Sequence, residues 1–155
     1  MQGQGSSDVD DRRAIEALVR AFFAVFDNRG GRRPRLGELH ELCMAECFIT
    51  KSEPSCLTVM GLEAFIAPRA ELLSCGRLVE FFEEEVTGRT DQFGGIAQRI
   101  SAYRKSGVLD GVAFAARGVK TMQLVRTADG WRISAVAWED ERAALPIPED
   151  LQRGH

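Results

Sequence analysis

The C-terminal half of the chain contains two strand-like stretches, VAFAARGVKTMQLVRT (residues 112–127) and WRISAVAWE (residues 131–139), separated by Ala128-Asp129-Gly130. Asp-Gly tolerates the positive φ of a tight turn, so this spacing predicts a β-hairpin. A two-residue turn at Asp129-Gly130 would pair Leu124 with Ala135 and Gln123 with Val136. In that register one face is wholly apolar and suits packing under helices: Met122, Leu124, Ile133, Ala135 and Ala137. The other face is mixed and suits a ligand cavity or a subunit contact: Thr121, Gln123, Val125, Ser134, Val136 and Trp138.

Outward from this hairpin, the sequence predicts helices first and strands second. Two more strand-like stretches, Arg77–Arg89 and Gly94–Lys105, precede the hairpin and complete an antiparallel meander. Ahead of them, apolar residues recur at helical spacing between Ile15 and Phe26, after acidic residues expected to cap that helix: Asp8, Asp10 and Asp11. The remaining elements expected are helices over Leu36–Ala45 and Gly61–Ser74 and short strands over Phe48–Lys51 and Cys56–Met60. Pro68 predicts a kink or early break in the third helix. This order is typical of an α+β domain.

Length and composition favour one compact domain. The chain has 155 residues, 45% hydrophobic and 28% charged, which excludes a wholly disordered chain. Its net charge of −3 argues against nucleic acid or an anionic membrane as the main partner. No apolar run approaches the ~18–20 residues of a membrane span, and the N-terminus lacks the features of a secretion signal, so we expect a cytoplasmic protein. The domain is predicted over residues 10–143, with flexible tails at 1–9 and 144–155, the second of which carries His155.

The cysteines allow two interpretations. The chain has four cysteines and no Cys-x-x-Cys pair. If residues 36–48 are helical, His40, Cys43 and Cys47 share one face and could begin a metal site. Alternatively Leu36, Leu39, Cys43 and Cys47 form a buried stripe in which cysteine acts as a small hydrophobe. One helix face rarely supplies a closed tetrahedral set, so we expect structural thiols and no metal.

Several local stretches carry a resemblance to a known superfamily. They are Phe93-Gly-Gly-Ile-Ala97, Ser101-Ala-Tyr103, Arg117-Gly-Val-Lys-Thr-Met-Gln-Leu-Val-Arg126, Asp129-Gly-Trp-Arg-Ile-Ser134 and Trp138-Glu139-Asp140. With the order of elements, they resemble the nuclear transport factor 2-like superfamily, near its SnoaL-like branch and that branch's uncharacterised bacterial members. The resemblance implies a cone-shaped, strongly bent antiparallel sheet packed against three N-terminal helices, with a pocket inside the cone. It also implies a homodimer, often formed through the outer face of the sheet.

The resemblance leaves the function open, because the superfamily includes isomerases, cyclases, hydratases and proteins that only bind. Its enzymes generally place an Asp or His in the cone with Tyr, Arg or Asn. Here the strands carry no histidine, and the consecutive acids Glu83, Glu84 and Glu85 are expected on a solvated strand face. The catalytic candidates are therefore Tyr103, Glu80 and Arg99, where Arg99 could pair with Glu80 or with a ligand carboxylate.

Four residues are predicted to bind a ligand. Phe26 would form the apolar floor of the pocket and Trp138 a wall. Gln123 needs a hydrogen-bond partner if it is buried, and Tyr103, the only tyrosine, is either a phenol donor to the ligand or a half-buried sheet aromatic. Together these residues outline a mainly apolar cavity with few polar anchors.

Motifs for phosphate or dinucleotide binding are missing from the sequence. There is no Walker-type loop, Rossmann glycine fingerprint or Gly-x-Ser-x-Gly elbow, so no cofactor is expected. The basic segment Arg29–Arg35 is expected to be a solvated loop rather than a phosphate or RNA site. The first hypothesis is a homodimer that binds a small, mainly apolar or mixed-polarity ligand. The alternative is a SnoaL-like isomerase, cyclase or hydratase that uses acid–base chemistry in the pocket. A third hypothesis is a structural protein whose sheet docks a partner.

Overall fold

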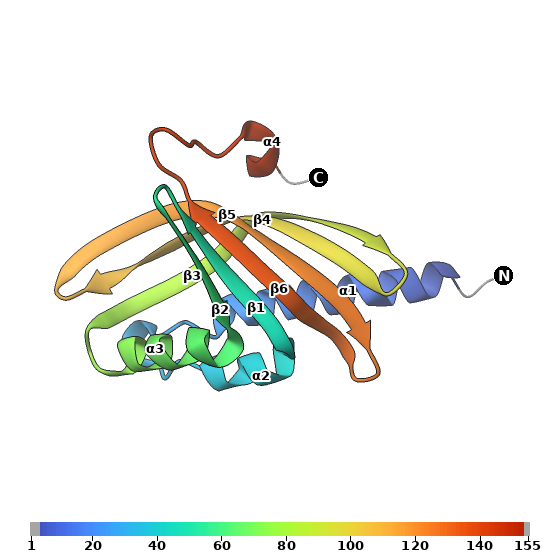
Figure 1. Cartoon of the computed structure of the whole chain (residues 1–155), viewed down its shortest axis with the longest axis horizontal. Coiled ribbons are helices and arrows are strands. Elements are labelled where there is room, and N and C mark those ends of the chain that lie inside the picture. The colour runs from blue at the N-terminus through green and yellow to red at the C-terminus, as the bar shows by residue number, and fades with distance from the viewer. Residues whose placement is uncertain (1–3, 154–155) are drawn as a thin grey trace.

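The computed structural model of the protein describes residues 4–153, which form helices around one curved sheet (Figure 1). The helices are α1 (Gln4–Ala24), α2 (Leu39–Leu42), α3 (Leu62–Ser74) and α4 (Glu149–Gln152), with 3₁₀ turns at Arg29–Gly31 and Leu36–Glu38. The strands are β1 (Cys43–Glu53), β2 (Cys56–Gly61), β3 (Leu78–Phe93), β4 (Ile96–Leu109), β5 (Val112–Thr127) and β6 (Gly130–Asp140).

The six strands form a single sheet in the order β2-β1-β6-β5-β4-β3. The sheet is strongly bent, with α1, α2 and α3 on its concave side and α4 on the opposite side (Figure 1). The predicted α+β fold, with a bent sheet packed against three N-terminal helices, is confirmed. One pairing departs from the expected antiparallel pattern, because β1 and β6 are parallel. These two strands come from opposite ends of the domain, so no local pattern reports their pairing.

The apolar face of the first helix forms the centre of the core, as predicted. Its members are all buried, and so is Phe26 in the turn that follows α1: Ile15, Leu18, Val19, Phe22, Phe23 and Phe26. The capping prediction is wrong, because α1 already begins at Gln4 and the three aspartates lie inside it. Asp11 instead accepts hydrogen bonds from Trp131 Nε1 at 2.9 Å and Arg126 Nη1 at 2.7 Å. It therefore ties α1 to the β5–β6 hairpin rather than capping a helix end.

The second helix ends earlier than expected. It stops at Leu42, and Cys43 and Cys47 lie on β1, where Cys43 pairs with Ile133 of β6. The proposed helical metal-ligand face is therefore not formed, and His40 is exposed, with Nε2 2.9 Å from Glu63 Oε1. Both thiols are nonetheless buried in the core, which confirms the structural interpretation. Pairing with a distant strand overrode the helical pattern.

The third helix continues through Pro68 to Ser74, so the early break predicted there does not occur. The basic segment after α1 is exposed, as expected for a solvated loop, and Gly30 and Gly31 both have positive φ. Arg29 and Arg32 in this loop form ion pairs with Asp27 at 2.8 and 3.0 Å.

The predicted register of the last hairpin is wrong. Thr127 pairs with Gly130, so the turn residues are Ala128 and Asp129. Leu124 pairs with Ile133, and a bulge then shifts the register so that Met122 pairs with Val136. The bulge rotates β6, because one extra residue on a strand reverses which side chains face the core. As a result the buried face of the hairpin is made by Met122, Leu124, Ile133 and Val136.

Beyond β6 the chain crosses to the outer face of the sheet. Ile147 is buried there, and the Thr87 hydroxyl donates a hydrogen bond to the backbone oxygen of Leu151. The flexibility of the tails and the domain limits at 10 and 143 stay predictions, and His155 lies outside the described residues. Between residues 4 and 153, no helix is both long enough and apolar enough to cross a membrane.

Candidate functional site

A cavity of about 300 Å³ lies between the concave face of the sheet and helices α1 and α3. Its walls come from both helices and from strands β1, β3, β4, β5 and β6. Most of the lining is apolar: Phe22, Phe26, Phe65, Leu72, Leu73, Leu78, Phe81, Leu109, Phe114 and Trp138. The charged lining residues are Lys51, Arg69, Glu83, Lys105 and Lys120. A partly open, mainly apolar space with a few polar groups is typical of a small-molecule site.

Edge-to-face aromatic contacts hold the apolar wall in place. Phe22 contacts Phe26 at 5.7 Å between ring centroids, and Phe65 contacts both Phe26 and Trp138 at 6.0 Å. This chain of rings runs from α1 and the turn after it through α3 to β6, so it joins the two helices to the sheet. It includes Phe26 and Trp138, two of the four ligand-binding residues expected from the sequence.

Lys120 is the most unusual residue at the cavity, and the sequence reasoning missed it. Its side chain is 5% exposed, and Nζ lies 2.5 Å from Glu83 Oε1. The ammonium also lies 4.8–5.7 Å from four ring centroids, those of Phe22, Phe23, Tyr103 and Trp138. Burial lowers the pKa of Lys120, while the charge of Glu83 opposes that shift.

The sequence did contain a signal for Lys120. On β5 it alternates with Met122 and Leu124, both of which are buried. A lysine in phase with apolar residues of a strand faces the same side as they do. A charge placed on a core face needs a partner. That partner, Glu83, comes from β3, which β4 separates from β5 in the sheet.

Tyr103 is a buried aromatic residue of the sheet, and its hydroxyl already has a partner within the protein. It is 1% exposed and does not contribute to the lining of the cavity. Its hydroxyl donates to Asp140, which Lys105 also approaches at 3.0 Å. Burial and this bond to Asp140 raise the pKa of Tyr103 well above its ordinary value of 10.0. The ring packs against Gly118, the residue opposite it on β5.

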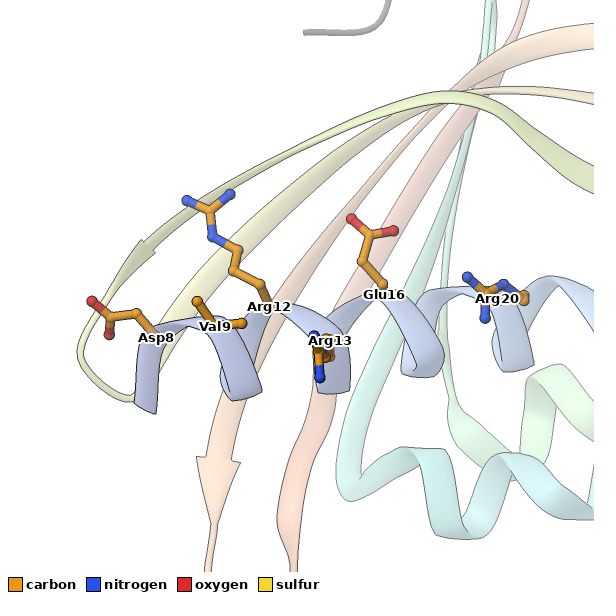
Figure 2. Close-up of a pocket in the computed structure, with 6 residues that line it drawn as sticks. All are labelled: Asp8, Val9, Arg12, Arg13, Glu16 and Arg20. Atoms are coloured by element: carbon orange, nitrogen blue, oxygen red, sulfur yellow. The ribbon is translucent and has the colours of Figure 1, made fainter. Parts of the chain in front are cut away.

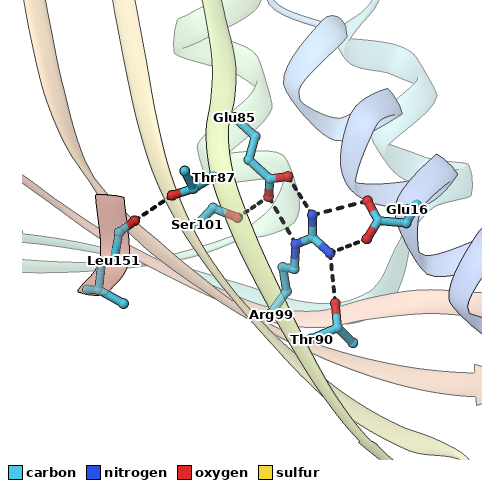
Figure 3. Close-up of polar contacts among 7 residues, drawn as sticks. All are labelled: Glu16, Glu85, Thr87, Thr90, Arg99, Ser101 and Leu151. Atoms are coloured by element: carbon cyan, nitrogen blue, oxygen red, sulfur yellow. Dashed lines mark hydrogen bonds and ion pairs between the residues drawn. The ribbon is translucent and has the colours of Figure 1, made fainter. Parts of the chain in front are cut away.

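Arg99 is buried in a network of protein partners (Figure 3). Its guanidinium bonds Glu85 at 2.5 and 3.0 Å, Glu16 at 2.6 and 3.1 Å, and the hydroxyl of Thr90 at 2.8 Å. Ser101 donates a further bond to Glu85 at 2.5 Å. Burial by itself would lower the pKa of Arg99. The hydrogen bonds and charges of Glu85 and Glu16 outweigh burial, so the net effect raises this pKa above its ordinary value. The network leaves Arg99 little capacity to bind a ligand carboxylate.

Glu80 does not pair with Arg99, so that expectation is wrong. Glu80 is exposed, has a φ of 52° and accepts a hydrogen bond from the backbone N–H of Gly30 at 2.9 Å. The irregularity at this point of β3, between Val79 and Phe82, changes which side chains face inward. Glu83 and Glu85 therefore turn toward the concave side and form ion pairs, contrary to the solvated face expected for them.

Gln123 lies on the outer face of the sheet and is exposed. The structure therefore does not bring Gln123 to the cavity. Of the sequence-derived candidates it brings together only Phe26 and Trp138, while Tyr103, Glu80 and Arg99 occupy three separate environments. The charged lining residues that the sequence reasoning did not select are Lys51, Arg69, Glu83, Lys105 and Lys120.

A second hollow, of about 480 Å³, lies along α1 (Figure 2). All of its lining residues belong to this one helix and are exposed: Asp8, Val9, Arg12, Arg13, Glu16 and Arg20. It has no opposing wall, so we do not assign it as the site. Across the described part of the chain, no three metal-ligating side chains cluster in space.

Comparison with known proteins identifies the fold. No protein-family model matches the chain, and no curated protein matches it. Solved structures do match. A nuclear transport factor 2-like superfamily protein from Salmonella enterica subsp. enterica serovar Typhimurium str. LT2 has a TM-score of 0.71 at 12% identity, over 96% of this chain and 99% of its own.

Two further matches extend this finding. Kfla4162 protein from Kribbella flavida has a TM-score of 0.68 at 20% identity, over 89% of this chain and 97% of its own. Hexachlorocyclohexane dehydrochlorinase LinA-type3 from Novosphingobium barchaimii LL02 has a TM-score of 0.66 at 17% identity, over 91% of this chain and 96% of its own. At these identities the likeness concerns the fold. The helices packed on a bent sheet and the matched structures together show that this chain has the nuclear transport factor 2-like fold.

Proposed function

We propose that the protein binds a small, mainly apolar molecule in the cavity inside its cone. The observation that carries this proposal is the cavity of about 300 Å³, lined mainly by aromatic and aliphatic side chains from α1, α3 and four strands of the sheet. Burying apolar ligand surface against such walls contributes about 25 cal/mol per Å² before the cost of immobilising the ligand. The three sequence-derived catalytic candidates are engaged elsewhere, so binding without transformation is the simpler function.

The neutral fluorescent probe N-phenyl-1-naphthylamine tests this proposal, because its emission rises when it leaves water. We expect saturable binding at one site per chain. Leu72→Phe, which places a larger ring at the half-buried lining residue Leu72, should weaken binding about 5- to 150-fold, since overpacking a filled site costs about 1–3 kcal/mol.

The matched control is Leu145→Phe, the same substitution at an exposed residue beyond β6 that does not line the cavity. It should leave binding unchanged. Absence of saturable binding, or equal weakening by both substitutions, would refute the cavity as the ligand site. The second result would place the probe on the protein surface.

A second candidate function is acid–base catalysis on a bound ligand. The observation that favours it is the Glu83–Lys120 pair, which lines the cavity and could accept and donate a proton. The test is deuterium exchange at the carbons next to the carbonyl of 4-phenyl-2-butanone, followed by NMR in D₂O. Enzyme-dependent exchange that Glu83→Gln abolishes, without loss of N-phenyl-1-naphthylamine binding, would support catalysis. Exchange at the background rate would count against proton abstraction at that position.

We also propose that the protein forms a homodimer through the outer face of its sheet. Exposed apolar side chains gather there on β1 and β2, where Phe48, Leu57 and Val59 are 53–67% exposed and share a face. Exposed apolar patches on a sheet commonly mark an interaction surface. Light scattering should give the mass of two chains, and a mass of one chain would refute the dimer.

A further inference from the structure

We propose that the cavity selects ligands that carry a carboxylate, and that Arg69 binds this group. The inference rests on the proposed ligand-binding function and adds the chemical class of the ligand. Its starting point is an imbalance of charge, because four cationic side chains line the cavity but only one carboxylate, that of Glu83, does so among the described residues.

Three of the four cations already have a carboxylate partner. Lys120 Nζ lies 2.5 Å from Glu83, Lys105 Nζ lies 3.0 Å from Asp140, and Lys51 Nζ lies 3.4 Å from Glu53. Each of these pairs is satisfied within the chain, so none of the three lysines requires a ligand anion.

Arg69 is the exception. Over residues 4–153, no carboxylate lies within ion-pair distance of its guanidinium. Nη1 donates to the backbone oxygen of Phe65 at 3.2 Å and approaches Met60 Sδ at 3.9 Å. Nε and Nη2 form no hydrogen bond within that part of the chain. One edge of the guanidinium is therefore available for a bidentate bond to a carboxylate.

The position of Arg69 is fixed by aromatic contacts rather than by charge. Its guanidinium carbon lies 4.0 Å from the ring centroid of Phe65 and 5.6 Å from that of Trp138. Both rings line the cavity, so the cation lies against the wall that would hold the apolar part of a ligand.

Burial also favours an anion at Arg69. The side chain is half-buried, and burial lowers the pKa of Arg69, with only the distant charge of Glu83 opposing the shift. A partly desolvated cation gains from an opposite charge more than a hydrated one does. The fitting ligand is an amphipathic monoanion whose apolar body lies on Phe22, Phe26 and Phe65 and whose carboxylate lies on Arg69.

A matched series of three probes tests this inference. The compounds 4-phenylbutanoate, 4-phenylbutanamide and 4-phenylbutylamine share one skeleton and differ in the charge of the head group. Each is measured by displacement of N-phenyl-1-naphthylamine. We expect the carboxylate to bind about 10- to 100-fold more tightly than the amide, as one charge-assisted bidentate bond provides, and the amine to bind more weakly than the amide.

Variants then assign the preference to Arg69. Arg69→Gln should abolish the preference for the carboxylate and leave the affinity of the amide within about twofold, because the amide gains little from the charge. Arg13→Gln removes the same charge from an exposed position on α1 and should preserve the preference. If Arg69→Gln fails to fold, Arg69→Lys serves in its place and should retain the charge but lose the bidentate part of the preference.

Two failures are distinguishable. If N-phenyl-1-naphthylamine does not bind in the cavity, the proposed function fails. If the probe binds but the wild-type protein does not prefer the carboxylate over the amide, the inference about ligand class is refuted while the binding function stands. A preference that persists in Arg69→Gln refutes the assignment to Arg69.

Discussion

Replacing Lys120 by Met should destabilise the protein by about 3 kcal/mol, because it leaves the carboxylate of Glu83 without its partner. Breaking a buried ion pair by removing one charge costs about 3–5 kcal/mol. Here the side chains of Lys120 and Glu83 are 5% and 10% exposed, and Glu83 borders the cavity, so we expect the lower end of that range. Methionine keeps the apolar contacts with the surrounding rings. The double variant Lys120→Met/Glu83→Gln should recover about 2 kcal/mol, since neither charge then remains buried.

Urea unfolding followed by far-UV circular dichroism measures this cycle, with an unchanged slope as the check on two-state behaviour. In a chain of this size the loss corresponds to a melting temperature lower by about 6–12 °C. If the double variant is as unstable as the sum of the two single variants, Lys120 and Glu83 do not interact, and the reasoning is refuted.

The same pair predicts a dependence on pH. Burial lowers the pKa of Lys120 below its ordinary value of 10.5. Between the lowered native pKa and 10.5 the unfolded chain binds more protons than the folded one, so the free energy of unfolding rises with pH in that window. The Lys120→Met variant lacks this contribution. The difference in the free energy of unfolding between wild type and the variant should therefore increase as the pH rises through this window. Parallel curves for the two proteins would contradict the shift.

Three further predictions follow from the packing around the sheet. Gly118→Ala should destabilise the protein by about 2–3 kcal/mol, because the added Cβ would overlap the Tyr103 hydroxyl and the backbone oxygen of Glu139. Gly37→Ala, with open space around it, is the control and should change urea stability little. Tyr103, the only tyrosine, should show no tyrosinate absorbance near pH 10, because burial and Asp140 raise its pKa. Stability should therefore fall above that pH, and native-state ionisation near pH 10 would contradict this. Arg99→Met should cost about 2–4 kcal/mol in urea unfolding, whereas Glu16→Gln, at a side chain 50% exposed, should cost under about 1 kcal/mol. Equal losses would contradict the network.

The sequence alone determined the elements whose side chains repeat with a clear period. The helical spacing between Ile15 and Phe26 identified the buried face of α1. The apolar stretches after residue 77 and the glycines between them identified the four long strands. Helices followed by a meander then indicated an α+β domain, because each of these features depends on neighbours within a few residues. The cone shape of the sheet was implied only by the family resemblance.

Only the tertiary structure decided the pairing and the site. Periodicity shows which side chains of a strand share a face, but only as far as the next bulge, beyond which the faces are exchanged. Such a bulge occurs on β3 near Glu80 and another on β6 in the last hairpin. The parallel contact of β1 with β6 converted a helical pattern at Cys43 into a strand. Arg69 and Lys120 meet at one cavity because distant segments of the chain converge there. Local alternation along β5 places Lys120 on the core side of the sheet. Which partner or empty space a charged side chain meets there depends on that convergence.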